Sequence, residues 1–216
     1  AAADVHVGRT VTTGLRTPWG MAFLPDGSAL VSERDTGRIV RVPADGGNAR
    51  LVGRVRQTRA AGEGGLLGLA VPPGANPSFV FAYVTTATDN RVLRIDWDGR
   101  RLGKARAILT GIPKGTNHNG GALLVGPSDT LFVGTGEIYQ RELAQKRSSL
   151  GGKILRVTFA GRPAPGNPFP GSPVYSLGHR NVQGLAFDSA GRLWATEFGE
   201  HDADELNLIR AWVDYG

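Results

Sequence analysis

The residues best suited to chemistry lie in one stretch, residues 178–206, which begins with GHRNVQG. Its first part supplies an imidazole, a guanidinium and two amides, and its last part is rich in carboxylates. Guanidinium and amide groups donate hydrogen bonds to anions, whereas hard cations prefer oxygen ligands. The stretch therefore predicts a site for an anionic ligand and a cation. Its polar residues are His179, Arg180, Asn181 and Gln183, then Glu197, Glu200, Asp202, Asp204 and Glu205.

A β-hairpin must hold these two groups of side chains at its ends. Residues 185–187 and 193–195 are apolar, and the Asp-Ser-Ala-Gly sequence between them is typical of a tight turn. The same order of a small-residue strand, a turn and a β-branched or aromatic strand recurs in units that start near residues 18, 64 and 120. Unit starts lie roughly 45 to 65 residues apart, the repeat length of propeller blades with inserted loops.

The repeated unit predicts an all-β fold, a β-propeller of four-stranded antiparallel blades. A β-sandwich also uses short strands, but it does not require the same three-strand phrase four times. Four units form either a small four-bladed ring or, as we favour, part of a longer protein, because a partial ring exposes two apolar blade faces. The expected strands are 18–23, 29–33, 38–42 and one near 51–55; 64–71, 79–84 and 91–95; 120–125, 130–136 and 153–157; and 185–187, 193–195 and 205–209.

The composition supports a turn-rich chain and excludes several classes of protein. The 216 residues include 32 Gly and 13 Pro but no Cys, so neither a disulfide framework nor a thiolate metal site is available. No apolar stretch is long enough to span a bilayer, and Ala1–Asp4 lacks the regions of a signal peptide, as an already processed exported protein would. The net charge is +6, but the arginines are scattered without interleaved aromatic residues, so we expect no nucleic-acid partner.

Seven motifs carry a family resemblance that covers nearly the whole chain. They resemble the soluble pyrroloquinoline-quinone (PQQ) dependent glucose/sorbosone dehydrogenases, the aldose sugar dehydrogenases, and GHRNxQG together with HNGG makes the resemblance specific. The motifs are PWGMAFLPDG at 18–27, GEGGLLGLAV at 62–71, NHNGGALLVGP at 117–127, LFVGTGE at 131–137, SLGGKILRV at 149–157, NPFPGSPVYSLGHRNVQGLAF at 167–187 and DELNLI at 204–209.

The resemblance implies a fold and an activity. Members of this family are six-bladed propellers that bacteria export, so it implies a periplasmic or secreted protein with about four blades here. We expect residues 1–216 to form a single β-propeller domain that is incomplete at its C-terminal end. The implied reaction is oxidation of an aldose at its anomeric carbon to a lactone, with PQQ as hydride acceptor, Ca²⁺ as Lewis acid and a soluble or membrane electron acceptor.

The resemblance also assigns roles to individual residues. His118 matches the general base, and Glu137 stands where the family has the aspartate that orients this histidine. Arg180 matches the arginine that stabilises charge on the reduced quinone. The implied cofactor-binding residues are Glu63, where several relatives have Gln, together with Arg180, Asn181 and Gln183. The implied calcium ligands are the carbonyls of Gly199 and Glu200, in place of a family Gly and Pro, and the pair Glu205 and Tyr215 at a second, structural ion.

Each assignment has a plainer alternative. His118 could be a turn residue, Arg180 could bridge blades, and residues 197–205 could be a solvated acidic loop. We expect His6 and His201 at the surface, His179 to support the rim through a hydrogen bond, and Trp19 and Trp194 to belong to blade cores rather than to stack on sugars. The alternative function is a non-catalytic, calcium-stabilised propeller that binds a carbohydrate or a protein.

Overall fold

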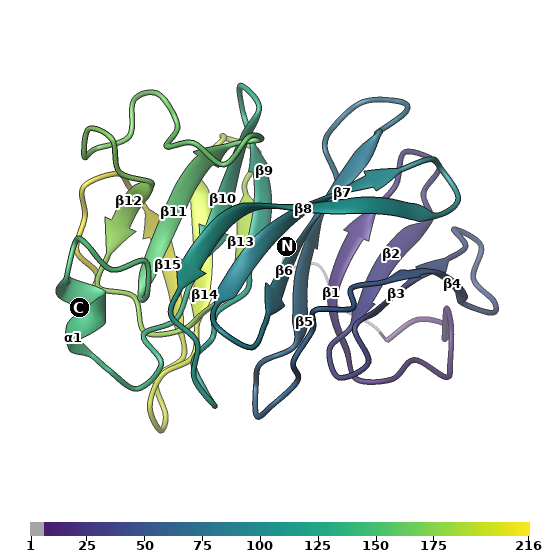
Figure 1. The fold of residues 1–216 in the computed structure, drawn as a ribbon, viewed down its shortest axis with the longest axis horizontal. Helices are drawn as coiled ribbons and strands as arrows, with labels where there is room; N and C mark the ends of the chain where they lie inside the picture. Colours follow the sequence, from purple (N-terminus) through teal and green to yellow (C-terminus); the bar gives the residue numbers. More distant parts are fainter. Residues whose placement is uncertain (1–6) are drawn as a thin grey trace, which may run out of the picture.

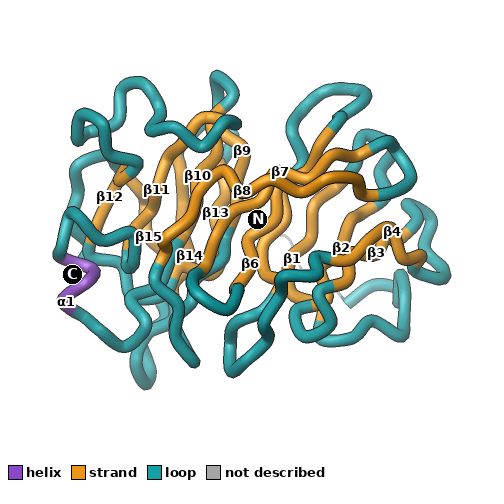
Figure 2. The backbone as a smooth tube through the Cα atoms, viewed as in Figure 1, coloured by secondary structure: helices purple, strands orange, loops and turns teal. Residues whose placement is uncertain are grey.

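The computed structural model describes residues 7–216, which fold almost entirely into antiparallel β-sheet (Figure 1 and Figure 2). The predictions for Ala1–Asp4 and His6 lie outside these residues. Three sheets have four strands each and the last has three. The strands are β1 (Pro18–Phe23), β2 (Ala29–Glu33), β3 (Arg38–Val42) and β4 (Arg50–Arg54); β5 (Leu66–Ala70), β6 (Phe79–Thr85), β7 (Asn90–Trp97) and β8 (Leu102–Ile112); β9 (Leu123–Gly126), β10 (Thr130–Gly134), β11 (Lys153–Thr158) and β12 (Val174–Leu177); and β13 (Val182–Phe187), β14 (Leu193–Glu197) and β15 (Glu205–Ile209).

The four sheets are the four predicted blades, and the all-β propeller prediction is confirmed. Neighbours in each sheet are consecutive in sequence, so every blade is an antiparallel meander. Each strand predicted from the repeated unit is present within a few residues of its expected bounds. The outer strands β8 and β12 were not predicted, because β8 is largely exposed and lacks an apolar face. One short helix, α1 (Glu142–Gln145), lies in the loop between β10 and β11.

The first strand of each blade lies innermost, and neighbouring blades touch along these strands. β5 contacts β1 and β9, and β9 contacts β13. Glycine permits this close approach, since a Cβ on Gly68 would lie 2.1 Å from the carbonyl oxygen of Gly121 in the next blade. Separate apolar clusters fill the space between successive blades, for example Leu30 and Ile39 against Leu93. Figure 1 shows the β1–β4 sheet at one end of the molecule and the later blades at the other.

Strand direction brings most of the candidate residues to one rim of the propeller. Because neighbouring strands are antiparallel, the loop that enters an inner strand and the loop that follows the second strand lie at the same edge of a blade. We call this edge the site rim. Its entering loops are 14–17, 59–65, 113–122 and 178–181, and its second loops are 34–37, 86–89, 135–152 and 198–204.

No helix within residues 7–216 has the length and apolar character that crossing a bilayer requires.

Candidate active site

His118 and Glu137 form a buried pair on the site rim. His118 lies in the loop before β9 with a left-handed φ of 53°, and Glu137 lies in the loop after β10. Their side chains are 4% and 3% exposed, and Nδ1 of His118 is hydrogen bonded to Oε1 of Glu137. A carboxylate can only accept, so the imidazole donates from Nδ1 and keeps the lone pair on Nε2. This tautomer is the one that a histidine acting as a base at Nε2 requires.

Glu63 ties the loop of His118 to the neighbouring blades. Its Oε2 accepts the backbone N–H of His118 at 2.7 Å, and its Oε1 accepts from Nδ2 of Asn117 at 3.0 Å. Nδ2 of Asn181, in blade 4, lies 3.5 Å from the same Oε2. Glu63 lies in the loop that leads into blade 2, and His118 lies in the loop that leads into blade 3. With Asn181 in blade 4, the Glu63 carboxylate therefore connects three blades.

Asn181 is a buried link between the entering loops of blades 3 and 4. Its Oδ1 accepts from the backbone N–H of Gly120 at 3.0 Å and from Nε2 of Gln183 at 2.9 Å. These bonds occupy the amide oxygen of Asn181 and orient its amide nitrogen toward Glu63. Asn181 and Gln183 therefore already hold the rim together without any ligand.

Arg180 is half-buried and is held by the loop that follows β14. Its backbone N–H donates to Oε2 of Glu197 at 3.0 Å, and its Nη1 donates to the carbonyl oxygen of Phe198 at 2.9 Å. Its guanidinium carbon lies 5.7 Å from the centre of the Tyr139 ring. The guanidinium still has unused N–H groups with which it can bind an anion.

Tyr139 covers His118 and was not singled out in the sequence. The two rings stack with centroids 3.8 Å apart and an interplanar angle of 28°. Gln140 donates its N–H to the carbonyl of Glu137 at 2.8 Å, and Ile138 and Tyr139 between them have φ of 54° and 60°. These values define a type I′ turn, which normally uses Gly or Asn. A β-branched residue at positive φ is strained, so the loop holds Tyr139 over the imidazole at a conformational cost.

His179 supports the rim, as predicted. It is fully buried, its Nδ1 is hydrogen bonded to Oε1 of Glu197 at 2.5 Å, and its Nε2 lies 2.8 Å from Oγ of Ser176. Burial alone would raise the pKa of Glu197, but the hydrogen bonds and charge of His179, with donors from Asn207 and Arg180, hold that pKa below its ordinary value.

A depression of about 320 Å³ opens between the loops of blades 3 and 4. Its wall contains the apolar ring of Phe198, the guanidinium of Arg180 and several carboxylates, so it offers groups of both charges. The predicted site residues in its lining are Glu137, Arg180, Gly199, Glu200, Glu205 and Tyr215. The predicted residues outside its lining are His118 and Asn181, which are buried, and Glu63 and Gln183, which are partly buried.

The residues predicted to bind calcium lie close together, but their side chains have other partners. The carboxylate of Glu200 pairs with Arg141, and Oε2 of Glu205 accepts from Asn207 at 2.8 Å. Tyr215 stacks on His179, with ring centroids 4.8 Å apart. Within the described part of the chain, no group of three or more His, Cys, Asp or Glu side chains is arranged to hold a metal ion.

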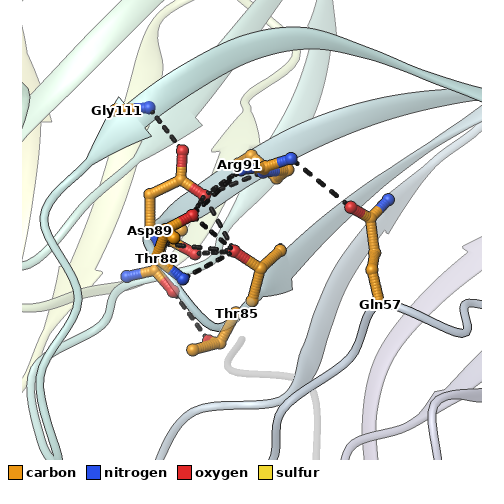
Figure 3. A network of polar contacts seen from close by, with 8 residues as sticks. Gln57, Thr85, Thr88, Asp89, Arg91 and Gly111 are labelled. Atoms are coloured by element: carbon orange, nitrogen blue, oxygen red, sulfur yellow. Dashed lines mark hydrogen bonds and ion pairs between the residues drawn. The ribbon is translucent and has the colours of Figure 1, made fainter.

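A polar network on blade 2 supports the loop that carries His118 (Figure 3). Oδ1 of Asp89 accepts from Nε of Arg91, and Oδ2 accepts from the backbone N–H of Gly111, both at 2.8 Å. The neighbouring Asn90 donates from Nδ2 to the carbonyl of Pro113 at 2.7 Å and to Oδ1 of Asn119 at 3.0 Å. Asp89 and Asn90 together therefore anchor both ends of the loop 111–119.

Lys153 anchors the loop 135–152, which contains Glu137, through its buried ammonium group. Its side chain is buried, and Nζ donates to the carbonyls of Leu143 at 2.6 Å and of Ala144 and Gly151 at 2.8 Å. Burial lowers the pKa of Lys153 to about 8, with Asp214 acting in the opposite sense.

The predictions for His201 and Trp19 agree with the structure. His201 is exposed. Trp19 packs against the core between blades 2 and 3. Trp194 is partly buried in β14, and its Nε1 donates to Asp188 at 2.9 Å. Neither tryptophan lines the depression at the site rim.

A β-propeller with a buried imidazole–carboxylate pair, an arginine and an acidic loop on one rim defines the class of this protein. The chain belongs to the Glucose / Sorbosone dehydrogenase family, whose model matches residues 15–216.

Several similar proteins are named as sugar dehydrogenases. The PQQ-bound aldose sugar dehydrogenase of Streptomyces coelicolor is 53% identical, with a TM-score of 0.94 over 98% of this chain and 65% of its own. The aldose sugar dehydrogenase of Escherichia coli strain K12 is 30% identical over 100% of this chain and 62% of its own length. Quinoprotein glucose dehydrogenase B of Acinetobacter calcoaceticus is 29% identical over 96% and 51%. The chain thus spans between 51% and 65% of the lengths of these three relatives.

Proposed function

We propose that the protein oxidises aldose sugars at the anomeric carbon to lactones, with PQQ as the hydride acceptor, bound Ca²⁺ and His118 as the general base. The observation that carries the proposal is the buried pair of His118 and Glu137, in which the carboxylate orients the imidazole. A propeller that only binds ligands does not require this pair. The names of the Streptomyces coelicolor and Escherichia coli relatives support the same activity.

The residues present suit PQQ, an anionic quinone. Arg180 lines the depression and has free N–H donors for a carboxylate or quinone oxygen. Asn181 and Gln183 lie outside its lining and connect the segment after Arg180 to Gly120 in the loop of His118. Bound PQQ would supply a two-electron acceptor, which no side chain of the protein can provide.

The roles of the protein residues follow from their hydrogen bonds. Nε2 of His118 takes the proton of the anomeric hydroxyl, and Glu137 stabilises the imidazolium that results. Glu63 holds the backbone of His118 and so fixes the position of its ring. Arg180 would supply N–H donors to the oxygens of a bound quinone.

In the loop 198–204, the backbone carbonyls are better candidate calcium ligands than the side chains. We propose that the carbonyls of Gly199 and Glu200 bind the ion beside the cofactor, and that Glu205 and Tyr215 contribute to a second ion. A Cβ on Gly199 would lie 2.2 Å from the carbonyl of Ala203, so the loop is tightly folded here, and Gly199 and Glu200 both line the depression. Removing calcium with a chelator should therefore weaken PQQ binding.

The second candidate function is a non-catalytic, calcium-stabilised propeller that binds a carbohydrate or a protein. The 3% exposure of His118 beneath Tyr139 favours it, because a base must reach its substrate. Sugar binding without reduction of PQQ would identify this alternative.

We propose export to the periplasm or medium, as the family resemblance implies. We also propose a propeller larger than the four blades described here, because the relatives are longer than this chain. The electron acceptor would be a soluble or membrane partner.

The first test is an equilibrium titration of the purified protein with PQQ in excess calcium. We expect saturable binding that Arg180→Ala weakens about tenfold or more, since a charge-assisted hydrogen bond is lost. Arg192→Ala is the matched control, because Arg192 pairs with Asp188 on the opposite rim of the same blade. Equal affinities for the two variants would contradict the role of Arg180, and absence of binding to the unmodified protein would overturn the proposed function.

A further inference from the structure

Blades 1 and 4 enter their inner strands through equivalent segments. Residues 14–23 read GLRTPWGMAF and residues 178–187 read GHRNVQGLAF. Both begin with a glycine at left-handed φ, 75° at Gly14 and 82° at Gly178. Each segment leads into the innermost strand of its blade, β1 or β13. The two segments are thus equivalent parts of their blades. Residues that they share serve the blade structure, and residues that differ are candidates for other roles.

In each segment, the backbone N–H of the arginine donates a hydrogen bond to a buried glutamate. Glu33 ends β2 and Glu197 ends β14, and both are almost fully buried. The backbone N–H of Arg16 donates to Oε1 of Glu33, and that of Arg180 donates to Oε2 of Glu197, each at 3.0 Å. The contact between carboxylate and amide therefore belongs to the blade architecture.

The residue before the arginine differs between the two blades. Leu15 occupies this position in blade 1 and packs against an apolar cluster. His179 occupies it in blade 4, fully buried and bonded to Glu197. Burying an imidazole and a carboxylate together costs desolvation free energy, which an aliphatic side chain avoids. Leu15 is only partly buried, whereas His179 is fully buried and bonded to Glu197, so the bond between imidazole and carboxylate is particular to blade 4.

The order Ser176, His179, Glu197 matches the hydrogen-bond order of a hydrolytic triad, but a nucleophilic role does not fit. Ser176 and His179 are both 0% exposed, so no acyl carbon can reach the hydroxyl. The serine instead fixes Nε2 of His179, at 2.8 Å, and so fixes the direction of Nδ1 toward Glu197.

The chain of hydrogen bonds ends at Arg180 on both its backbone and its side chain. Glu197 holds the backbone N–H of Arg180, and the next residue, Phe198, accepts from Nη1 through its carbonyl at 2.9 Å. Phe198 also donates its N–H to the carbonyl of Asn181 at 3.3 Å. Fixing Glu197 therefore fixes the guanidinium at the edge of the depression.

We propose that His179 and Glu197 form a positioning pair that holds Arg180 in place for an anionic quinone. His179 and Glu197 belong to the lining of the depression, but their side chains are almost fully buried, so we assign the pair a role through Arg180. The inference rests on the proposed function, since that function supplies the ligand that Arg180 meets.

The experiment compares PQQ affinity, measured by equilibrium titration in excess calcium, among matched variants. We expect Glu197→Gln and His179→Leu each to weaken binding by about tenfold, a loss of roughly 1.4 kcal/mol. Glu33→Gln, the equivalent change in blade 1, should leave the affinity unchanged. Leucine is the chosen replacement because Leu15 occupies the equivalent position in blade 1.

A double-mutant cycle distinguishes positioning from general damage to the fold. In protein that already carries Arg180→Ala, adding Glu197→Gln should change PQQ affinity less than about twofold, because the group being positioned is gone. A tenfold loss in both backgrounds would overturn the proposal, as would an unchanged affinity for Glu197→Gln alone.

A second readout needs no cofactor and separates the two possible failures. The ¹⁵Nε resonance of Arg180, assigned by its loss in Arg180→Lys, should shift or broaden in Glu197→Gln and stay unchanged in Glu33→Gln. If the unmodified protein binds no PQQ, the proposed function fails, and this resonance alone decides whether the pair positions Arg180. A resonance that is the same in all three proteins would overturn the pair.

Discussion

Oε1 of Glu137 is bonded to Nδ1 of His118, and Oε2 of Glu137 is buried without a hydrogen-bond partner among residues 7–216. An unpaired buried carboxylate oxygen is costly, and such groups in native structures need an explanation. The imidazole of His118 is thus the hydrogen-bond partner of this carboxylate, and Glu137 also belongs to the wall of the adjoining depression. In the proposed mechanism this carboxylate is the group that faces the imidazole when His118 takes up a proton.

Replacing Glu137 tests this relationship directly. Glu137→Gln keeps the shape but loses the charge that stabilises the imidazolium, so we expect kcat to fall roughly a hundredfold or more while PQQ affinity changes little. Glu137→Asp, the residue of the family motif, should retain more activity than Gln does. Steady-state kinetics with saturating PQQ and calcium measure both. A Gln variant with wild-type kcat would exclude Glu137 from the chemistry.

Tyr139 is expected to limit access to His118. Tyr139→Gly removes the ring that stacks on the imidazole and relieves the left-handed φ of 60°. We predict that diethyl pyrocarbonate modifies His118 several-fold faster in this variant, as followed by peptide mass spectrometry. The exposed His201 serves as the internal control, because its rate should not change. Unchanged protection of His118 would mean that other groups cover it.

The network around Asp89 is expected to stabilise the loop of His118 in a pH-dependent way. Burial acts to raise the pKa of Asp89, but the N–H of Gly111 and the side chain of Arg91 hold it below 3.8. Since the folded pKa is depressed, the stabilisation is present above about pH 3.8 and is lost as pH falls through the folded value. Asp89→Asn should cost about 1–3 kcal/mol of unfolding free energy at pH 7.

The matched control for this prediction is Asp98→Asn. Asp98 also caps a turn, by accepting from the N–H groups of Arg100 and Arg101, but it lies on the opposite rim. Urea unfolding of the two variants measures stability, and hydrogen exchange of residues 111–119 measures the loop. Equal protection of the loop in both variants would show that Asp89 does not anchor it.

Lys153 predicts a second, alkaline dependence of stability. Its folded pKa of about 8 lies below the ordinary 10.5, so between these values the unfolded chain binds more protons than the folded chain. The unfolding free energy of the protein relative to Lys153→Met should therefore rise with pH in this window, by at most about 1.4 kcal/mol per pH unit. The exposed Lys104, changed to Met, is the control. A difference that stays flat from pH 8 to 10.5 would contradict the lowered pKa.

The blades could be predicted from the sequence because their signal is local. Each hairpin combines strand-forming residues with turn residues, as in 185–187 and 193–195, and this pattern repeats along the chain. β8 escaped prediction because most of its side chains face solvent, and only its pairing with β7 makes it a strand. Tertiary pairing decided its structure, and single-sequence patterns do not contain that information.

Part of the site could be predicted and part could not. The motifs identified His118, Arg180 and Asn181, and strand direction then brought them to one rim. Tyr139 could not be predicted, because it reaches His118 only through two consecutive residues at positive φ that have neither Gly nor Asn. The hydrogen bond between Glu197 and Arg180 was not predicted either, although the similarity of residues 14–23 and 178–187 could have indicated it.

The most direct test of the central claim is a single-turnover reaction. The PQQ-bound protein in calcium is mixed anaerobically with an excess of glucose or another aldose, and the quinone absorbance is followed. We predict sugar-dependent reduction that is at least a hundredfold slower in His118→Gln, a variant that still binds PQQ. Bound quinone that no aldose reduces, or that is reduced equally fast without His118, would contradict the proposed dehydrogenase.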